Sequence, residues 1–253
     1  MERSGEGVRK PVIMGLFDEQ VEEVGRFLAC MRDRGDLREL EARGERWPSG
    51  SSLLLAEDTA MELGNPSVAS LSFVVWGDPA RVRDGVVSLV GPDIAEVRSD
   101  SVPFAQVLIV SGEFTDEYES YRDLREAIYD TLLDGFTVRT MPSRQSVWCR
   151  VSREAMDKGF SLGDLGAAMT RNLKAVEPVS GAEALFVTSS TVDVEKLAPA
   201  ASGARRIVEA LMKMYEEENF DCETCEYKDV CDEVMDLKKI REKLADEKAR
   251  AGP

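Results

Sequence analysis

The sequence contains no histidine among its 253 residues. That absence excludes a serine or cysteine nucleophile activated by histidine, because no imidazole is present to act as the base. It also restricts any soft-metal site to cysteine sulfur, completed if needed by a carboxylate. Such a donor set favours an iron–sulfur cluster or an all-thiolate zinc site.

Long apolar runs are also missing. Runs such as 53–56 and 73–76 are only four residues long, whereas a transmembrane helix needs about 20. The first ten residues lack the apolar stretch of a signal peptide. Five cysteines, three of them clustered, do not fit a secreted disulfide framework. We therefore expect a cytoplasmic protein without a membrane partner.

Basic residues are fewer than acidic residues. Lys and Arg number 32 against 48 Asp and Glu, which gives a formal net charge of −16. A surface this acidic repels the phosphate backbone, so nucleic acid is not expected as a partner. Apolar residues still make up 43% of the chain, enough for a sizeable core, so disorder of the whole chain is excluded.

The order of predicted elements indicates the fold class. Short β-rich runs bounded by turn residues occur at 52–56, 70–76, 86–90, 106–111, 136–140, 147–151 and 184–188. Helical spacing of apolar residues appears at 16–34, 116–133, 164–174, 192–197, from 202 onward, and at 233–248. Strands that alternate irregularly with helices predict an α+β fold, with a mixed sheet and flanking helices.

Three regions follow from this organisation. Residues 1–45 hold an N-terminal tail and a helix, residues 46–201 the α+β domain, and residues 202–253 a helical segment with most of the cysteines. The loop after the first helix has its clearest turn signal at 47–52, Trp-Pro-Ser-Gly-Ser-Ser.

The run 221–231, Asp-Cys-Glu-Thr-Cys-Glu-Tyr-Lys-Asp-Val-Cys, is the most specific signal for chemistry. It gathers Cys222, Cys225 and Cys231 within ten residues. Two thiolates separated by two residues can bind one metal centre from a single turn, and a third can close on it. A [4Fe–4S] cluster is the leading interpretation. Structural zinc is the alternative, and cysteines without a metal are the third reading.

A cubane cluster takes four ligands, and the local sequence supplies three. Folding could bring Cys149 or Cys30 to the site, or the fourth ligand could be a carboxylate such as Asp221 or Asp229, or an external group. Cys30 lies beside an apolar helical stripe and is expected to be a small buried residue. On a strand, Cys149 faces opposite to Trp148 and inward, where packing or ligation would suit it.

Several segments resemble a known family. They are Val-Gly-Pro-Asp-Ile at 90–94, Pro103-Phe104, Val-Trp-Cys-Arg-Val-Ser-Arg-Glu-Ala-Met-Asp-Lys-Gly-Phe-Ser at 147–161, Phe-Val-Thr-Ser at 186–189 and Asp-Val-Glu-Lys-Leu at 193–197. In this order they resemble the acetyl-CoA synthase subunit of the CO dehydrogenase/acetyl-CoA synthase complex. The resemblance covers residues 53–197, and the stretch 148–160 is its most specific part.

The resemblance implies that residues 46–201 match the synthase's middle α+β domain, which has been associated with docking of ferredoxin and coenzyme A. The family's tryptophan and arginine correspond here to Trp148 and Arg150. An indole can stack on adenine and a guanidinium can bind phosphate. Strand alternation alone would also place these two residues on one half-exposed face, as ordinary surface residues.

The chain departs from the family at its metal ligands. Cys222, Cys225 and Cys231 stand where the family's cluster domain begins, but the gap to the third cysteine is shorter and no fourth follows. No Cys-Gly-Cys is present to hold the distal nickel. The resemblance therefore implies that this chain alone does not assemble acetyl-CoA at a nickel centre.

A small basic island lies near Trp148 and consists of Arg139, Arg144, Arg150, Arg153 and Lys158. On so acidic a chain it is a candidate docking patch for coenzyme A or an acidic redox protein, with Arg150 and Arg153 as the contacts. The alternative reading is a set of scattered, solvated cations.

These observations lead to one leading hypothesis and two others. The first is an accessory iron–sulfur protein of anaerobic one-carbon metabolism that docks a partner or transfers electrons in a CO dehydrogenase/acetyl-CoA synthase or corrinoid methyltransferase system. The second is a coenzyme A-binding component of a multi-subunit acyl or methyl transferase. The third is a zinc-stapled scaffold.

Overall fold

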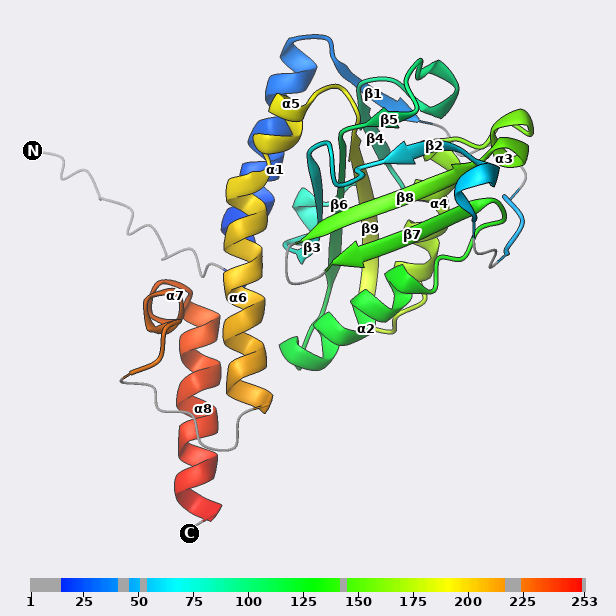
Figure 1. The fold of residues 1–253 in the computed structure, drawn as a ribbon. Coiled ribbons are helices and arrows are strands. Elements are labelled where there is room, and N and C mark those ends of the chain that lie inside the picture. Colours follow the sequence, from blue (N-terminus) through cyan, green and yellow to red (C-terminus); the bar gives the residue numbers. More distant parts are fainter. Residues whose placement is uncertain (1–14, 41–45, 51–53, 142–144, 217–223, 252–253) are drawn as a thin grey trace, which may run out of the picture.

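The computed structural model describes residues 15–40, 46–50, 54–141, 145–216 and 224–251. It confirms the predicted α+β class, with two mixed sheets where the sequence predicted one. Helices flank both sheets, and a helical C-terminal part extends away from them (Figure 1).

The five-stranded sheet forms the centre of the molecule. Its neighbouring strands pair alternately antiparallel and parallel, beginning with an antiparallel edge pair. In spatial order they are β1 (Leu37–Leu40), β4 (Val87–Val90), β9 (Val179–Val187), β6 (Phe104–Gly112) and β3 (Ser70–Trp76). β6 is buried along almost its whole length, as expected for a central strand covered on both faces.

The four-stranded sheet adjoins the first through contacts of β8 with β3 and β6. Its spatial order is β5 (Ser101–Val102), β2 (Thr59–Leu63), β8 (Ser146–Ser152) and β7 (Phe136–Met141). β2 and β5 are parallel, and the other two pairs are antiparallel. Along β8 the burial alternates from residue to residue, so one face packs inward and the other is partly open.

The helices cover the sheets from several sides. α1 (Asp18–Asp33) and α6 (Ala198–Glu216) pack on each other and on β3, and α4 (Leu162–Lys174) packs on β4 and β9. α2 (Glu117–Tyr129) contacts α4 and α6, while α3 (Arg153–Asp157) and α5 (Thr191–Glu195) are single short turns. None of the described helices is long and apolar enough to cross a membrane.

The C-terminal helices form a layer on α6. α7 (Lys228–Glu233) and α8 (Met235–Ala251) pack on each other and on α6. Figure 1 shows α6 between this pair and the sheets. The predicted boundary between residues 201 and 202 falls inside α6, whose buried residues belong to the same hydrophobic cluster as both sheets.

Most predicted elements are present, with three corrections. The segment after α1 contains strand β1 rather than only a loop, and β1 pairs with β4. Residues 54–56 are not a strand, and the strand of this region is β2, a few residues later; residues 52–53 of that prediction lie outside the described residues. Cys30 is exposed rather than buried, because it lies on the outer side of α1, beside the apolar stripe and not in it.

Candidate functional site

Two of the clustered cysteines meet at one small hollow between α6, α7 and α8. Cys225 is partly exposed and Cys231 is buried, and both line this hollow. The local backbone explains the arrangement: the Lys228 amide donates to the Cys225 carbonyl, and the Cys231 amide donates to the Tyr227 carbonyl as α7 begins. Cys222 lies outside the described residues.

Three cationic residues line the same hollow as the two cysteines. Lys213, Lys228 and Arg241 line the same hollow. Lys213 pairs with Glu226 at 3.5 Å, and Arg241 pairs with an aspartate of α7 at 2.8 Å. Lys213 and Arg241 are therefore already paired with carboxylates, which offset part of the positive charge that they bring to the hollow.

The carboxylate of Asp229 is already engaged. Arg206 Nη2 donates to Asp229 Oδ2 at 2.6 Å, and this guanidinium holds the pKa of that carboxyl below its usual range. Asp229 is therefore tied to α6 rather than turned towards the cysteines. Within the ranges that the structure describes, no three Cys, Asp or Glu side chains converge to hold a metal ion.

The size of the hollow limits what fits there. Its described walls enclose about 10 Å³, room for about one water molecule. The donor type suits a soft metal, and a single ion matches this volume. A cubane cluster would need the walls formed by α6 and α7 to move apart.

Cys149, a predicted candidate for the fourth ligand, lies elsewhere. It is on β8, paired in register with Leu63 of β2 and Val138 of β7, and is fully buried. Burial raises the pKa of its thiol far above the usual range. It does not line the hollow, and α6 lies between the α7–α8 pair and the sheets (Figure 1). The predicted inward orientation of Cys149 is confirmed, and its surroundings are those of a packing residue.

Trp148 and Arg150 lie on one face of β8, as strand alternation predicted. The Arg150 Cζ atom is 4.7 Å from the centroid of the Trp148 ring, and the Arg139 Cζ atom is 5.6 Å from it. Arg150 Nε also donates to Glu62 Oε1 at 2.9 Å. The guanidinium predicted to bind a ligand's phosphate is thus already held by a carboxylate and an indole.

The indole nitrogen of Trp148 is buried without a hydrogen-bond partner among the described residues. Arg153, the third predicted contact, is exposed at the start of α3 and lines a neighbouring cleft together with Glu62 and Asp100. The two acids make this cleft a poor place for a polyanion.

The rest of the basic island is dispersed. Lys158 forms ion pairs with Glu154 at 2.7 Å and Asp134 at 3.7 Å, and Arg144 lies outside the described residues. Sequence reasoning missed Glu62, whose pairing with Arg150 links β2 to β8 across 88 residues.

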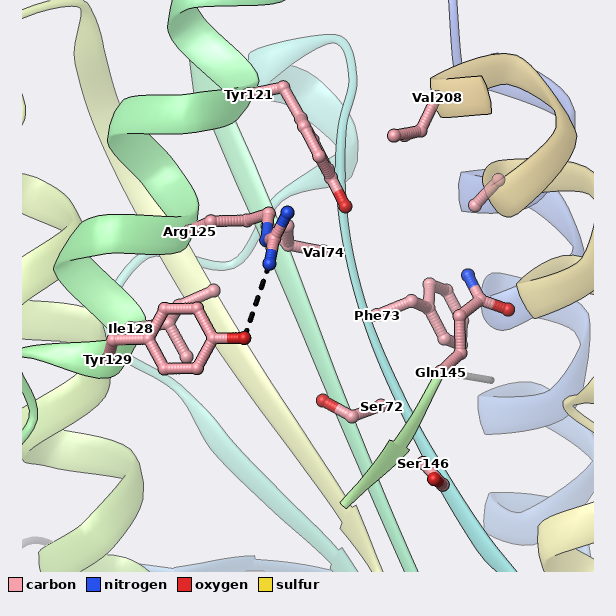
Figure 2. A pocket seen from close by; sticks show the side chains of 11 residues that line it. Ser72, Phe73, Val74, Tyr121, Arg125, Ile128, Tyr129, Gln145, Ser146 and Val208 are labelled. Atoms are coloured by element: carbon pink, nitrogen blue, oxygen red, sulfur yellow. Dashed lines mark hydrogen bonds between the residues drawn. The ribbon is translucent and has the colours of Figure 1, made fainter. Parts of the chain in front are cut away.

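A second hollow, missed from the sequence, lies between β3, α2 and α6 (Figure 2). Arg125 stands there between two tyrosines of the same helix, Tyr121 and Tyr129. Their spacing of four residues was the available signal, because residues four apart share a helix face.

The segments that carry the family resemblance contact one another. Asp93 Oδ1 accepts from the backbone amides of Ile94, at 2.7 Å, and Leu162, at 2.8 Å. Thr188 Oγ1 donates to the Pro92 carbonyl at 2.6 Å. Gly91 has φ of +108°, and a Cβ there would lie 2.4 Å from the Ser189 nitrogen. These motifs form a structural joint between the ends of β4 and β9 and the start of α4.

A family profile described as the CO dehydrogenase/acetyl-CoA synthase complex beta subunit matches residues 51–190. The chain is also similar to proteins named acetyl-CoA decarbonylase/synthase complex subunit beta. The Methanopyrus kandleri protein is 31% identical over 166 residues, covering 65% of this chain and 33% of its own. The Methanothermobacter thermautotrophicus protein is 34% identical over 133 residues, covering 52% and 28%.

The Archaeoglobus fulgidus protein is 26% identical over 178 residues, covering 67% of this chain and 33% of its own. The chain therefore spans about a third of the length of the curated relatives it matches. The matched region contains both sheets except β1, and it ends before α6 and the cysteine segment.

Proposed function

The chain belongs to the family of CO dehydrogenase/acetyl-CoA synthase complex beta subunits, and on that premise we propose that it is an accessory iron–sulfur protein of such a system. It would dock a protein partner or transfer electrons in anaerobic one-carbon metabolism. The partner would belong to a CO dehydrogenase/acetyl-CoA synthase or a corrinoid methyltransferase system.

One observation carries the proposal. Two cysteines of the clustered run, Cys225 and Cys231, line one hollow together with Lys213, Lys228 and Arg241. Sulfur donors beside cations suit a metal centre that bears net negative charge. Cys222, three residues before Cys225, would be the third ligand.

A bound cluster would supply one-electron transfer, and the chain's own residues would hold and shield it. Cys231 is buried against α6, and Cys225 is partly exposed. A centre held there would lie near the surface, in the layer that projects from the sheets (Figure 1). Such a position suits exchange of electrons with a docked partner.

The zinc-stapled scaffold has its own support. The described walls enclose about 10 Å³, which fits a single ion better than a cubane. A structural zinc on Cys225 and Cys231 would join the turn before α7 to α7 itself and stabilise the C-terminal layer.

Anaerobic purification of the full chain with iron, sulfide and zinc analysis tests the proposal. We expect brown protein with iron and acid-labile sulfide in comparable amounts, lost in Cys225→Ser and Cys231→Ser. Cys30→Ser, an exposed cysteine on α1, is the matched control and should keep the metal. Colourless protein with stoichiometric zinc supports the scaffold, and metal-free protein contradicts both.

Coenzyme A binding at the Trp148 face is the other candidate. No carboxylate among the described residues forms an ion pair with Arg139, which lies 5.6 Å from the Trp148 ring, so Arg139 is better placed than Arg150 to meet a phosphate. Arg153 shares its cleft with Glu62 and Asp100 and would contribute less. Calorimetry with coenzyme A on wild type and on the Arg139→Gln, Arg153→Gln double variant tests this candidate. Absence of heat with the wild-type chain would remove it.

A further inference from the structure

The hollow between β3, α2 and α6 contains an arginine that pairs with no carboxylate among the described residues. Arg125 Nη2 donates to the Tyr129 hydroxyl at 3.2 Å, and no Asp or Glu among the described residues lies within ion-pair distance. The other half-buried arginines differ: Arg83 pairs with Glu183, and Arg150 pairs with Glu62. On a chain of net charge −16, a shielded guanidinium without a carboxylate has unused capacity for an anion.

Two tyrosine rings hold this guanidinium in place. The Arg125 Cζ atom is 5.7 Å from the centroid of Tyr121 and 5.6 Å from that of Tyr129. Burial raises the pKa of Tyr121, so its hydroxyl keeps its proton at neutral pH. Figure 2 shows the Tyr121 hydroxyl and the Arg125 guanidinium facing the same space.

A serine adds a third donor. Gln106 Nε2 donates to Ser72 Oγ at 3.3 Å, which leaves the Ser72 hydroxyl proton available. Ser72 lines the hollow from β3, and its hydroxyl faces the space near Arg125 (Figure 2). Among the described lining residues there is no Asp or Glu. The polar groups that converge here therefore favour an acceptor with negative charge.

The backbone beside the hollow is held in a costly conformation. Gln145 has φ of +48°, a left-handed conformation that is unfavourable for a residue with a side chain. Its carbonyl accepts from the Ser72 amide at 2.6 Å. This bond fixes the end of the β7–β8 turn against β3, so Gln145 and Ser146 line the side of the hollow across from α2 (Figure 2).

The remaining walls and the volume restrict the ligand. Apolar lining comes from β3, α2 and α6, through Phe73, Val74, Ile128, Ala204 and Val208. The hollow measures about 70 Å³, room for about five water molecules or a ligand of about five heavy atoms. A planar guanidinium matches a planar carboxylate, and the apolar walls match a short alkyl chain.

We propose that this hollow binds a short-chain alkyl carboxylate, with Arg125 on the carboxylate, Tyr121 and Ser72 as further donors, and the alkyl chain against β3 and α6. The site is separate from the cysteine hollow and does not depend on a metal. A ligand of this size binds with a Kd of about 1 mM or weaker.

The test uses propanoate on the full chain, followed by amide chemical shifts in NMR. We expect saturable shifts in α2 and β3. The affinity for the neutral isostere propanamide should be lower by about tenfold or more, because propanamide loses the charge-assisted hydrogen bond. Arg125→Gln should cause the same loss, and Tyr121→Phe a smaller one.

Arg122→Gln is the matched control, because Arg122 lies on the same helix but is exposed and paired with Glu119. It should bind propanoate like wild type. Equal binding of propanoate and propanamide, unchanged binding in Arg125→Gln, or tighter binding of inorganic phosphate than of propanoate would overturn the proposal. The propanoate–propanamide comparison needs no variant, so it decides the matter even if Arg125→Gln fails to fold.

Discussion

The carboxylate of Asp93 accepts a hydrogen bond from the backbone amide of Leu162 at 2.8 Å, across 69 residues of sequence. The same oxygen accepts from the Ile94 amide at 2.7 Å. One side chain thus accepts hydrogen bonds from an amide of the turn after β4 and from the first amide of α4. Amides at a helix start have no partner within the helix, so this aspartate joins two elements that the sequence keeps far apart.

Asp93→Ala should therefore lower the free energy of unfolding by about 1–3 kcal/mol, because two amides lose their acceptor, one of them the amide of the fully buried Leu162. Urea denaturation with an unchanged slope measures the loss. Asp78→Ala is the control, since Asp78 caps only the exposed turn Pro79–Arg81; it should cost less. Equal losses of unfolding free energy in the two variants would mean that the hydrogen bond from Asp93 to α4 does not contribute to stability.

Arg150→Ala should destabilise the chain by about 1–2 kcal/mol, because it removes a partly shielded ion pair with Glu62 and a contact with the Trp148 ring. Tryptophan emission should shift as well, since Trp148 is one of three tryptophans. Arg153→Ala, at an exposed position, should leave both signals nearly unchanged. A stability loss as large in Arg153→Ala would contradict the assigned contacts.

Asp193 should make stability depend on acid pH. Hydrogen bonds from Lys196, with those from Ser189 and Ser190, lower the pKa of Asp193 from 3.8 to about 2. A lowered folded-state pKa stabilises the fold above the unfolded value, and this contribution is lost as pH falls from about 4 to about 2.

The Asp193 shift corresponds to about 2 kcal/mol. Asp193→Asn should lose stability of that order at pH 7, and its difference from wild type should shrink below about pH 4. Unfolding measured at several pH values checks this. Asp33→Asn, at an exposed position of α1, should show the same dependence of unfolding free energy on pH as wild type. If the stability difference between Asp193→Asn and wild type is the same at every pH, the predicted linkage is wrong.

Deleting residues 220–253 should leave a chain that still unfolds cooperatively. α7 and α8 pack on the outer side of α6, whereas both sheets keep their own buried contacts. The deletion uncovers apolar residues of α6 such as Met214, so some stability is lost. Calorimetry of the truncated chain checks the prediction, and an aggregated or molten product would show that the C-terminal layer belongs to the folding core.

The sequence alone determined the features that local pattern controls. The apolar run at 70–76 is strand β3 with the predicted bounds. Alternation along 147–151 correctly placed Trp148 and Arg150 on one face and Cys149 on the other. These features depend on the repeat of a strand or helix and on residue chemistry, both of which are present in the chain before it folds.

Only the tertiary structure decided which distant residues meet. It paired strand β1 with β4 and gave Arg150 a carboxylate in Glu62, whereas Arg125 pairs with no carboxylate in the part of the chain that the structure describes. It also buried Cys149 in a sheet, away from the hollow of Cys225 and Cys231. The physical reason is that such meetings depend on strand register and on how helices pack, and local periodicity leaves both undetermined.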